Sequence, residues 1–311
     1  MTTPTLLSPV EVMKMGLVYV GIGQEQQAKM SVQDNVDDFK AHFGSTPLVI
    51  ADIWHDLCHT TIEEAQLEER EKSEKGFKRY MIGHFFLWAH PKNIKLMKSR
   101  FDICERYLQG KELWYWPKKI RALKKKKIVW SSDLQSNDTA TIALTVDGVN
   151  YRAWEKKHPT LNKDPAFYDH KHHSCGYKYE IAVMIYEPKI VWIKGPIRCG
   201  KGDRDVFRED GLKEKLESTP GKMGIADSGY EMGEARDMGF LCLPNTMDTK
   251  ELKHFKTRAR CRHETLNGRL NNFKILQDTF RHGMECHGIA LDTVAVITQY
   301  QMDNGAPIFD V

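Results

Sequence analysis

The chain has 311 residues, of which 41% are hydrophobic and 28% charged, which suits one large domain or two modest ones with a sizeable core. No apolar run approaches the ~18 residues of a membrane span, and the start lacks the basic segment of a secretory signal. The net charge is only +4, and the seven cysteines include no CxxC pair, which favours free thiols in a reducing compartment over a disulfide framework.

The first 60 residues form a poorly defined N-terminal segment, because prolines and glycines interrupt any periodic pattern. A helical region is expected over 61–130. Glutamates load its first turns, where the helix dipole favours acids, and the apolar stretch 79–90 predicts a buried helix that Pro91 ends or kinks.

A basic helix is expected next, at 92–111. Two short helices separated by a tight break give the outline of a helix-turn-helix, and a helical hairpin in a core or a solvated surface would look the same. As a DNA-binding element, this helix would use Lys92, Lys95, Lys98 and Arg100.

A second basic run covers 117–127, and three aromatic residues, Trp114, Tyr115 and Trp116, precede it. The run is compatible with a nuclear import signal, a DNA-backbone contact or a solvated linker. The aromatic side chains would either stack on bases or fill a hydrophobic contact.

The second half of the chain alternates between strand and helix patterns. Strands are expected at 142–148, 179–186, 189–195, 222–227 and 240–244, and helices at 204–218, 251–276 and 285–301. This order predicts an α/β fold, a mixed sheet flanked by helices, as one domain over 140–311.

Three acidic residues stand out by their positions. Asp147 and Asp227 each end a predicted strand, and Glu264 lies in a basic helix. Acids at strand ends are common turn or cap residues, but in α/β folds the same position often holds a site. Three converging carboxylates could bind two divalent cations, Mg²⁺ or Mn²⁺, which prefer oxygen ligands and can stabilise both oxygens of a displacement at phosphorus.

The sequence motifs around these acids resemble those of a known protein family. The phrases TVDG, GPIRCGKGDRDVFREDGL (195–212), IADSGY (225–230) and RARCRHETLNGRLNNF (258–273) resemble the DDE nuclease domain of Harbinger-type (PIF) transposases. The resemblance implies an RNase H-like fold behind a helical, helix-turn-helix-like region. It also implies cleavage of DNA by two-metal catalysis, with subsequent strand transfer, by an enzyme that acts on phosphodiester bonds.

The resemblance also assigns roles to individual residues. Asp147, Asp227 and Glu264 would be the catalytic, metal-binding triad, with Asp203 and Arg260 in supporting positions. The Tyr-Arg-Glu-Lys signature of related bacterial transposases is incomplete, since Thr257 and Asn271 stand at its tyrosine and lysine positions. Arg258, Arg262 and Arg269, on the same helix, would hold the phosphate backbone of double-stranded DNA.

Other interpretations stay open at this level. The protein could be a domesticated, transposase-derived DNA-binding protein that does not cleave, or a repair-type nuclease without strand transfer. The run DHKHHSCGYK (169–178) could form a zinc site, but its ligands are too closely spaced, and an exposed loop is favoured. A Myb-like partner protein, a homodimer and nuclear localisation in a eukaryotic source are expectations from the resemblance alone.

Overall fold

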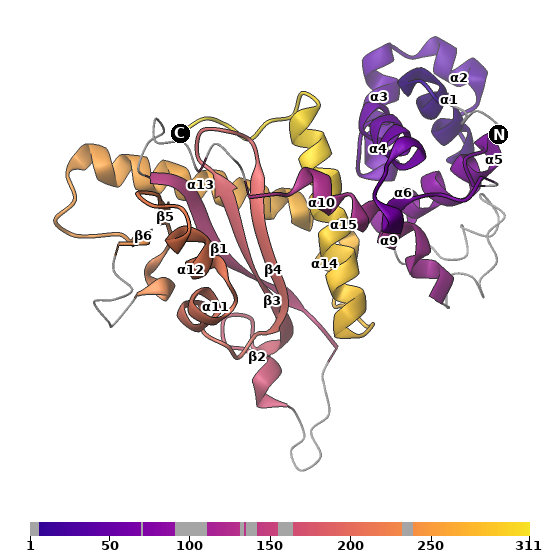
Figure 1. Cartoon of the computed structure of the whole chain (residues 1–311). Coiled ribbons are helices and arrows are strands. Elements are labelled where there is room, and N and C mark those ends of the chain that lie inside the picture. The colour runs from indigo at the N-terminus through magenta and orange to yellow at the C-terminus, as the bar shows by residue number, and fades with distance from the viewer. Residues whose placement is uncertain are drawn as a thin grey trace. The chain divides into compact units, whose positions relative to one another are not determined.

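The computed structural model describes residues 6–69, 71–90, 111–130, 134, 142–154, 164–231 and 239–311. The chain divides into two compact units, which are described separately (Figure 1). The first contains residues 1–127, 270–277 and 289–306, and the second contains 128–269, 278–288 and 307–311. The expected domain limits at residues 60, 130 and 140 stay a prediction. No helix in the described residues is long and apolar enough to cross a membrane.

The first unit is helical, as the sequence predicts for the N-terminal region. Its elements are α1 (Pro9–Tyr19), α2 (Gln24–Lys29), α3 (Val32–Phe43), α4 (Pro47–His59), η1 (Glu63–Ala65), α5 (Glu74–Gly76), η2 (Phe77–Ile82), α6 (Gly83–Ala89), η3 (Lys111–Trp114), α9 (Tyr115–Ala122), α10 (Lys124–Lys127), α14 (Lys274–Gln277) and most of α15 (Met284–Asp303). The basic helix expected at 92–111 lies almost entirely outside the described residues.

The poorly defined segment before residue 60 is in fact four helices with clear start signals. Ser8 and Glu11 form a capping box at α1, and the Thr46 hydroxyl caps α4 ahead of Pro47. Gly44 ends α3 in the left-handed conformation, with φ of 68°. A side chain there would be strained, and its Cβ would lie 3.2 Å from the Phe273 ring.

Aromatic side chains fill the interior of the helical unit. The Trp54 ring meets that of Phe77 edge-on at 5.1 Å and lies 6.2 Å from that of Trp116. Trp114 and Trp116 are both buried, which identifies them as core residues and leaves no face of either free for a base.

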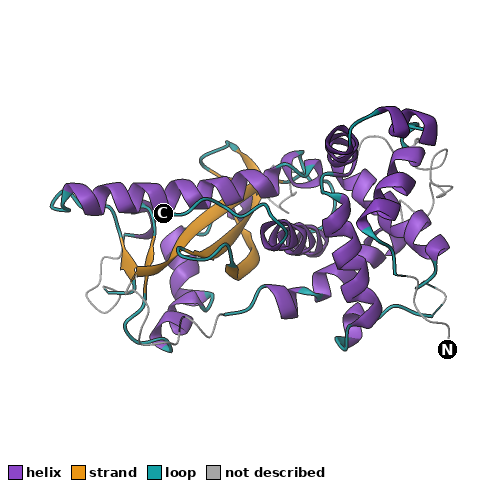
Figure 2. Ribbon diagram, turned by 90° about the horizontal axis from the view of Figure 1, so that it is seen from above, coloured by secondary structure: helices purple, strands orange, loops and turns teal. Residues whose placement is uncertain are grey.

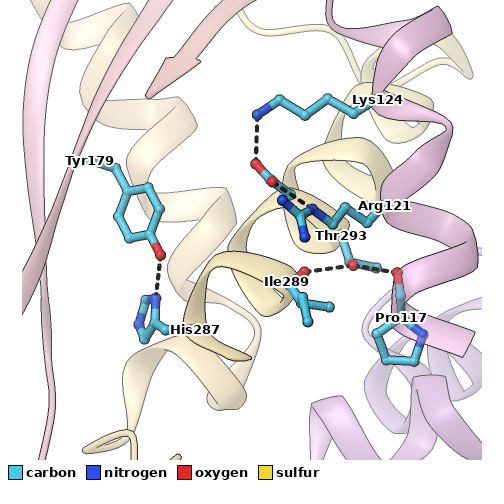
Figure 3. A network of polar contacts seen from close by, with 8 residues as sticks. Pro117, Arg121, Lys124, Tyr179, His287, Ile289 and Thr293 are labelled. Carbon is cyan, nitrogen blue, oxygen red and sulfur yellow. Dashed lines mark hydrogen bonds and ion pairs between the residues drawn. The ribbon is translucent and has the colours of Figure 1, made fainter. Parts of the chain in front are cut away.

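The basic run before residue 128 is largely occupied by ion pairs within this unit (Figure 3). Arg121 and Lys124 both bind the nearly buried Asp292, at 3.0 and 2.7 Å. The next three lysines pair with acids as well, Lys125 with Glu64, Lys126 with Asp56 and Lys127 with Asp303. The run therefore ties together segments of the helical unit, a role that the sequence pattern did not suggest.

The second unit is a mixed α/β structure, which confirms the predicted fold class. Its described elements are β1 (Ile142–Arg152), η5 (Pro165–Phe167), β2 (Tyr168–Asp169), β3 (Ser174–Met184), β4 (Ile190–Arg198), α11 (Asp203–Glu209), α12 (Leu212–Glu217), β5 (Met223–Ile225), η6 (Ser228–Tyr230), β6 (Leu241–Cys242) and most of α13 (Lys250–Asn271). Helix α13 lies along one face of the sheet, with α11 and α12 on the other (Figures 1 and 2).

The six described strands form one sheet in which β1 is central. On one side, β1 pairs antiparallel with β3, which pairs antiparallel with β4. On the other side, β1 pairs parallel with β5, which pairs parallel with β6. Three antiparallel strands followed by two parallel ones around a central first strand is consistent with the expected RNase H-like fold.

Several elements differ from the sequence prediction. The helix predicted at 251–276 ends at Asn271 and is followed by the short α14, and β3 begins at Ser174 instead of residue 179. Strand β1 continues four residues beyond the predicted end at 148, so Asp147 lies within the strand and not at its end. The helix predicted at 204–218 is two helices, because Gly211 between them adopts φ of 100°. A side chain is rarely tolerated in that conformation, so a continuous helix is interrupted there.

The two faces of β1 pack on different layers because side chains alternate along a strand. Leu144 and Val146 join the core that α11 and α12 supply through Phe207 and Leu212. Thr145, on the opposite face, meets α13 instead, since its Oγ1 lies 2.8 Å from Nδ1 of the buried His263. Asp147 is two residues further along and therefore lies on the α13 face as well.

A buried histidine anchors the far end of the same sheet (Figure 3). The Tyr179 hydroxyl lies 2.7 Å from His287 Nδ1, and Tyr151, Tyr177 and Phe280 surround the imidazole ring. Burial lowers the pKa of His287 to about 3, so this histidine is neutral at ordinary pH and serves as a packed aromatic group.

Candidate active site

Two of the three predicted acids lie side by side because their strands are parallel neighbours. Thr145 of β1 is level with Ile225 of β5, and the same register two residues later brings Asp147 level with Asp227. The Asp227 carboxylate accepts a hydrogen bond of 2.8 Å from the Gly229 amide and so caps η6. The cap fixes the direction of this carboxylate at the edge of the site.

Asp203, the first residue of α11, completes a group of three aspartates. Two glycines make the approach possible. A Cβ atom on Gly148 would lie 2.6 Å from Asp203 Oδ1, and one on Gly229 would lie 3.0 Å from Asp227 Oδ1 and 3.1 Å from Asp203 Oδ2. A side chain at Gly148 would therefore displace Asp203, and one at Gly229 would displace both Asp203 and Asp227.

The electrostatics of Asp147 show that these carboxylates interact. Burial raises its pKa from 3.8 to about 6, and the charges of Asp227 and then Asp203 act in the same direction. A hydrogen bond of 2.9 Å from Asn267 Nδ2 to Asp147 Oδ2 opposes the rise. At neutral pH Asp147 is therefore a partly buried carboxylate whose negative charge the hydrogen bond from Asn267 offsets only in part.

Lys178 of β3 supplies a positive charge to this group. Its ammonium group lies 2.6 Å from Asp203 Oδ1 and 2.8 Å from the Lys201 carbonyl oxygen, and the side chain is almost fully buried. The lysine thus holds Asp203 in place next to β1 and offsets part of the repulsion among the aspartates.

We expect Lys178→Met to lower the free energy of unfolding of the metal-free protein by about 1–3 kcal/mol, because an acid loses its buried cation. The loss is smaller than for a fully buried pair because the Asp203 side chain is 28% exposed. Chemical denaturation measures it, with Lys194→Met as the control, since Lys194 is exposed on the adjacent strand. Equal stability of the two variants would contradict this role for Lys178.

Behind the aspartates lies a further acid, Glu180, which the sequence pattern gave no reason to single out. It is fully buried on β3, level with Gly148 of β1, and neither of its carboxylate oxygens has a hydrogen-bond partner among the described residues. Trp192 Nε1 and the Tyr230 hydroxyl lie close enough to favour the ionised form, but their geometry falls short of hydrogen bonds. Burial outweighs them and raises the pKa of Glu180 to about 8.

The third predicted acid, Glu264, occupies a different environment. It is exposed on α13, whereas Asn267 of the same helix contacts Asp147. Within the described residues, no group of three or more acidic, histidine or cysteine side chains has the geometry of a metal site. The expected ligand set of Asp147, Asp227 and Glu264 is therefore not assembled here, and the role of Glu264 stays a prediction.

The arginines of α13 that were predicted to bind DNA lie in different environments. The assignment of Arg262 was wrong, because its side chain is buried and donates to the carbonyl oxygens of Met184, Glu187, Ile308 and Phe309. Because Arg262 lies in a basic stretch of sequence, its pattern does not show that it holds backbone carbonyl groups in the interior.

The remaining candidates for DNA contact are unevenly placed. Arg258 is exposed and donates to the Asp310 carbonyl oxygen, and the half-buried Arg269 donates to that of Pro307. Arg260 is partly buried, and its Nε lacks a partner among the described residues. The four candidates of the basic helix, Lys92, Lys95, Lys98 and Arg100, lie outside the described residues.

The histidine-rich run at 169–178 forms local contacts rather than a metal site. His172 Nδ1 lies 2.6 Å from Asp169, His173 Nδ1 lies 3.2 Å from the Tyr168 hydroxyl, and Cys175 Sγ donates to the Trp154 carbonyl oxygen. The predicted exposed loop is confirmed only for residues 170–173, because Ser174–Lys178 already belong to β3 and the last four of these residues are buried.

An open pocket of about 430 Å³ adjoins the aspartates. The starts of α11 and η6 line it, through Gly202, Asp203, Arg204, Asp205, Ser228, Gly229 and Glu231. A substrate in this pocket would meet Asp203 directly, and Arg204 offers a positive charge at its rim.

A known protein family matches the part of the chain that contains this site. Residues 146–299 match the DDE superfamily endonuclease family. The match covers just under half of the chain and includes all three aspartates, Glu264 and Asn267. Neither curated proteins nor solved structures gave a match to the chain. The family match supports a transposase-like nuclease domain here, with DNA as its substrate class.

Proposed function

We propose that this protein is a DDE transposase of the Harbinger type that cleaves DNA phosphodiester bonds with two divalent metal ions and then transfers the freed strand. The observation that supports this most is the approach of Asp147 and Asp227 on neighbouring parallel strands, with Asp203 beside Asp227, within the part of the chain that matches DDE endonucleases.

The donor set suits a hard cation such as Mg²⁺ or Mn²⁺. Carboxylate oxygens are the preferred ligands of these ions, and Asp147 is held at a raised pKa by burial and by its neighbours' charges. A cation would relieve that repulsion. Asp147 and Asp227 would hold it, with Glu264 as the third ligand and Asp203 in support.

Bound metal would activate the attacking water or hydroxyl group and stabilise charge on the phosphate. The chain's own residues orient the reaction. The Gly229 amide fixes the Asp227 carboxylate, Lys178 fixes Asp203, and α13 places polar side chains beside Asp147. In this proposal the exposed Arg204 and Arg258 would contact the phosphate backbone.

Cleavage of supercoiled plasmid tests the proposal. We expect the wild-type protein to nick DNA with Mg²⁺ or Mn²⁺ and Asp227→Asn to lose at least a hundredfold in rate, since the amide still caps η6 but cannot supply a carboxylate. Glu217→Gln, an exposed acid of α12, is the matched control and should cleave as wild type does.

Each result has a distinct meaning. Absence of nicking by wild type, together with tight and salt-sensitive DNA binding, would favour a domesticated DNA-binding protein. Equal nicking by wild type and Asp227→Asn would refute the assignment of the acids. Nicking without strand transfer of a cleaved end would favour a simple nuclease. The Myb-like partner and the homodimer remain predictions from the Harbinger resemblance.

A further inference from the structure

We propose that Asn267 is a positioning residue for Asp147, and that its side-chain amide sets the orientation in which the first aspartate meets a divalent cation. This inference rests on the proposed function, because it assigns a role within the same metal site. It goes beyond that proposal by naming a neutral side chain of α13 outside the three expected acids.

The packing of α13 determines which residue reaches Asp147. His263 is fixed on the sheet by Thr145, and Leu266 and Leu270 are fully buried beside it. Successive residues of an α-helix are about 100° apart, so Asn267 lies about 40° to one side of His263 and Glu264 about 100° to that same side. Asn267 therefore lies nearest the sheet on this flank, and Glu264 points further toward solvent.

The direction of the hydrogen bond follows from chemistry. An ionised carboxylate only accepts, so the Asn267 amide must turn its NH₂ group toward Asp147, and Nδ2 lies 2.9 Å from Oδ2. A flipped amide would bring two acceptors together. One oxygen of Asp147 is thereby engaged by a neutral donor, which restricts rotation of the carboxylate.

This orientation of the Asn267 amide leaves its oxygen without a hydrogen bond in the described part of the chain, which costs free energy and indicates a functional reason for the orientation. Asn267 Oδ1 is buried and has no hydrogen-bond partner among the described residues. An asparagine that served packing alone would be replaced without loss by an apolar side chain of similar shape. An amide kept there with one half unsatisfied is instead explained by its donation to the neighbouring aspartate.

Two variants separate positioning from packing. Asn267→Leu retains the approximate shape but cannot donate, whereas Asn267→Gln retains the donor but is one methylene longer. Loss of a group that orients a metal ligand typically weakens metal binding by about 10–100-fold. We expect this loss in Asn267→Leu, and we expect Asn267→Gln to retain most of the affinity. If the Asn267 side chain only packed, Asn267→Leu would keep more of the metal affinity than the longer Asn267→Gln.

Mn²⁺ binding followed by electron paramagnetic resonance is the primary measurement, because it does not require cleavage. Thr265→Ala is the control, since among the described residues the Thr265 hydroxyl donates to the Cys261 carbonyl oxygen within α13 and has no contact with the aspartates. In a cleavage assay, Asn267→Leu should need about 10–100-fold more metal for half-maximal rate and approach the wild-type rate at saturation.

The outcomes distinguish the two proposals. Wild-type protein that binds no Mn²⁺ overturns both. Binding that disappears in Asp227→Asn but is unchanged in Asn267→Leu overturns the role of Asn267 and leaves the metal site intact. Weakened binding in Asn267→Leu, restored in Asn267→Gln, supports the positioning role even if the wild-type protein does not cleave DNA.

Discussion

Asp147→Asn is expected to make the metal-free protein more stable while it abolishes metal-dependent cleavage. The pKa of Asp147 is raised to about 6, so above that pH the folded protein carries a charge that burial and the neighbouring acids disfavour. The unfolded chain ionises freely near 3.8, and the difference corresponds to about 3 kcal/mol as an upper figure. Asparagine removes the charge and can still accept from Asn267, so most of this cost should be recovered.

Thermal unfolding in the presence of a chelator at pH 7.5 measures the effect, alongside plasmid cleavage with Mg²⁺. Added Mg²⁺ should stabilise the wild-type protein and have little effect on Asp147→Asn, because a ligand stabilises only the state that binds it. Glu217→Gln controls for the change in net charge. A lower melting temperature for metal-free Asp147→Asn would contradict this prediction and show that the carboxylate stabilises the fold.

How far the sequence predicts the site depends on the kind of signal at each residue. Asp147 and Asp227 follow strand-forming runs, and parallel pairing of those strands makes their approach predictable from pattern and resemblance together. Asn267 and Glu180 could not be found in this way. An asparagine in a helix and a glutamate in a strand carry no local signal, and their importance arises from contacts across the sheet.

The errors have the same origin. Arg262 was grouped with DNA-binding arginines because a run of basic residues usually marks a solvated face, yet four backbone carbonyl groups hold it in the interior. The helices before residue 60 are hard to predict because their apolar patterns are short and prolines and glycines separate them. Only tertiary contacts distinguish a buried arginine from an exposed one, so charge pattern alone could not correct that assignment.

Glu180→Gln is expected to remove a pH dependence of stability that the wild-type protein shows between about pH 4.5 and 8. The folded-state pKa of Glu180 is raised to about 8 from the ordinary 4.5, so the folded protein keeps a proton there that the unfolded chain releases. The contribution of protonated Glu180 to the free energy of unfolding is fully present below its ordinary pKa of 4.5. It is lost as pH rises toward the folded-state value, at up to about 1.4 kcal/mol per pH unit.

Glutamine mimics the protonated acid, so the difference in unfolding free energy between Glu180→Gln and wild type isolates this contribution from other titrating groups. From pH 6 to pH 9 that difference should shift in favour of the variant by about 2–3 kcal/mol. Guanidinium denaturation at several pH values, with a chelator present, provides the measurement. A constant difference would mean that Glu180 is ionised in the folded protein at neutral pH. The interior of the sheet behind Asp147 would then carry a negative charge, and the demand of this site for cations would be greater than the three aspartates alone imply.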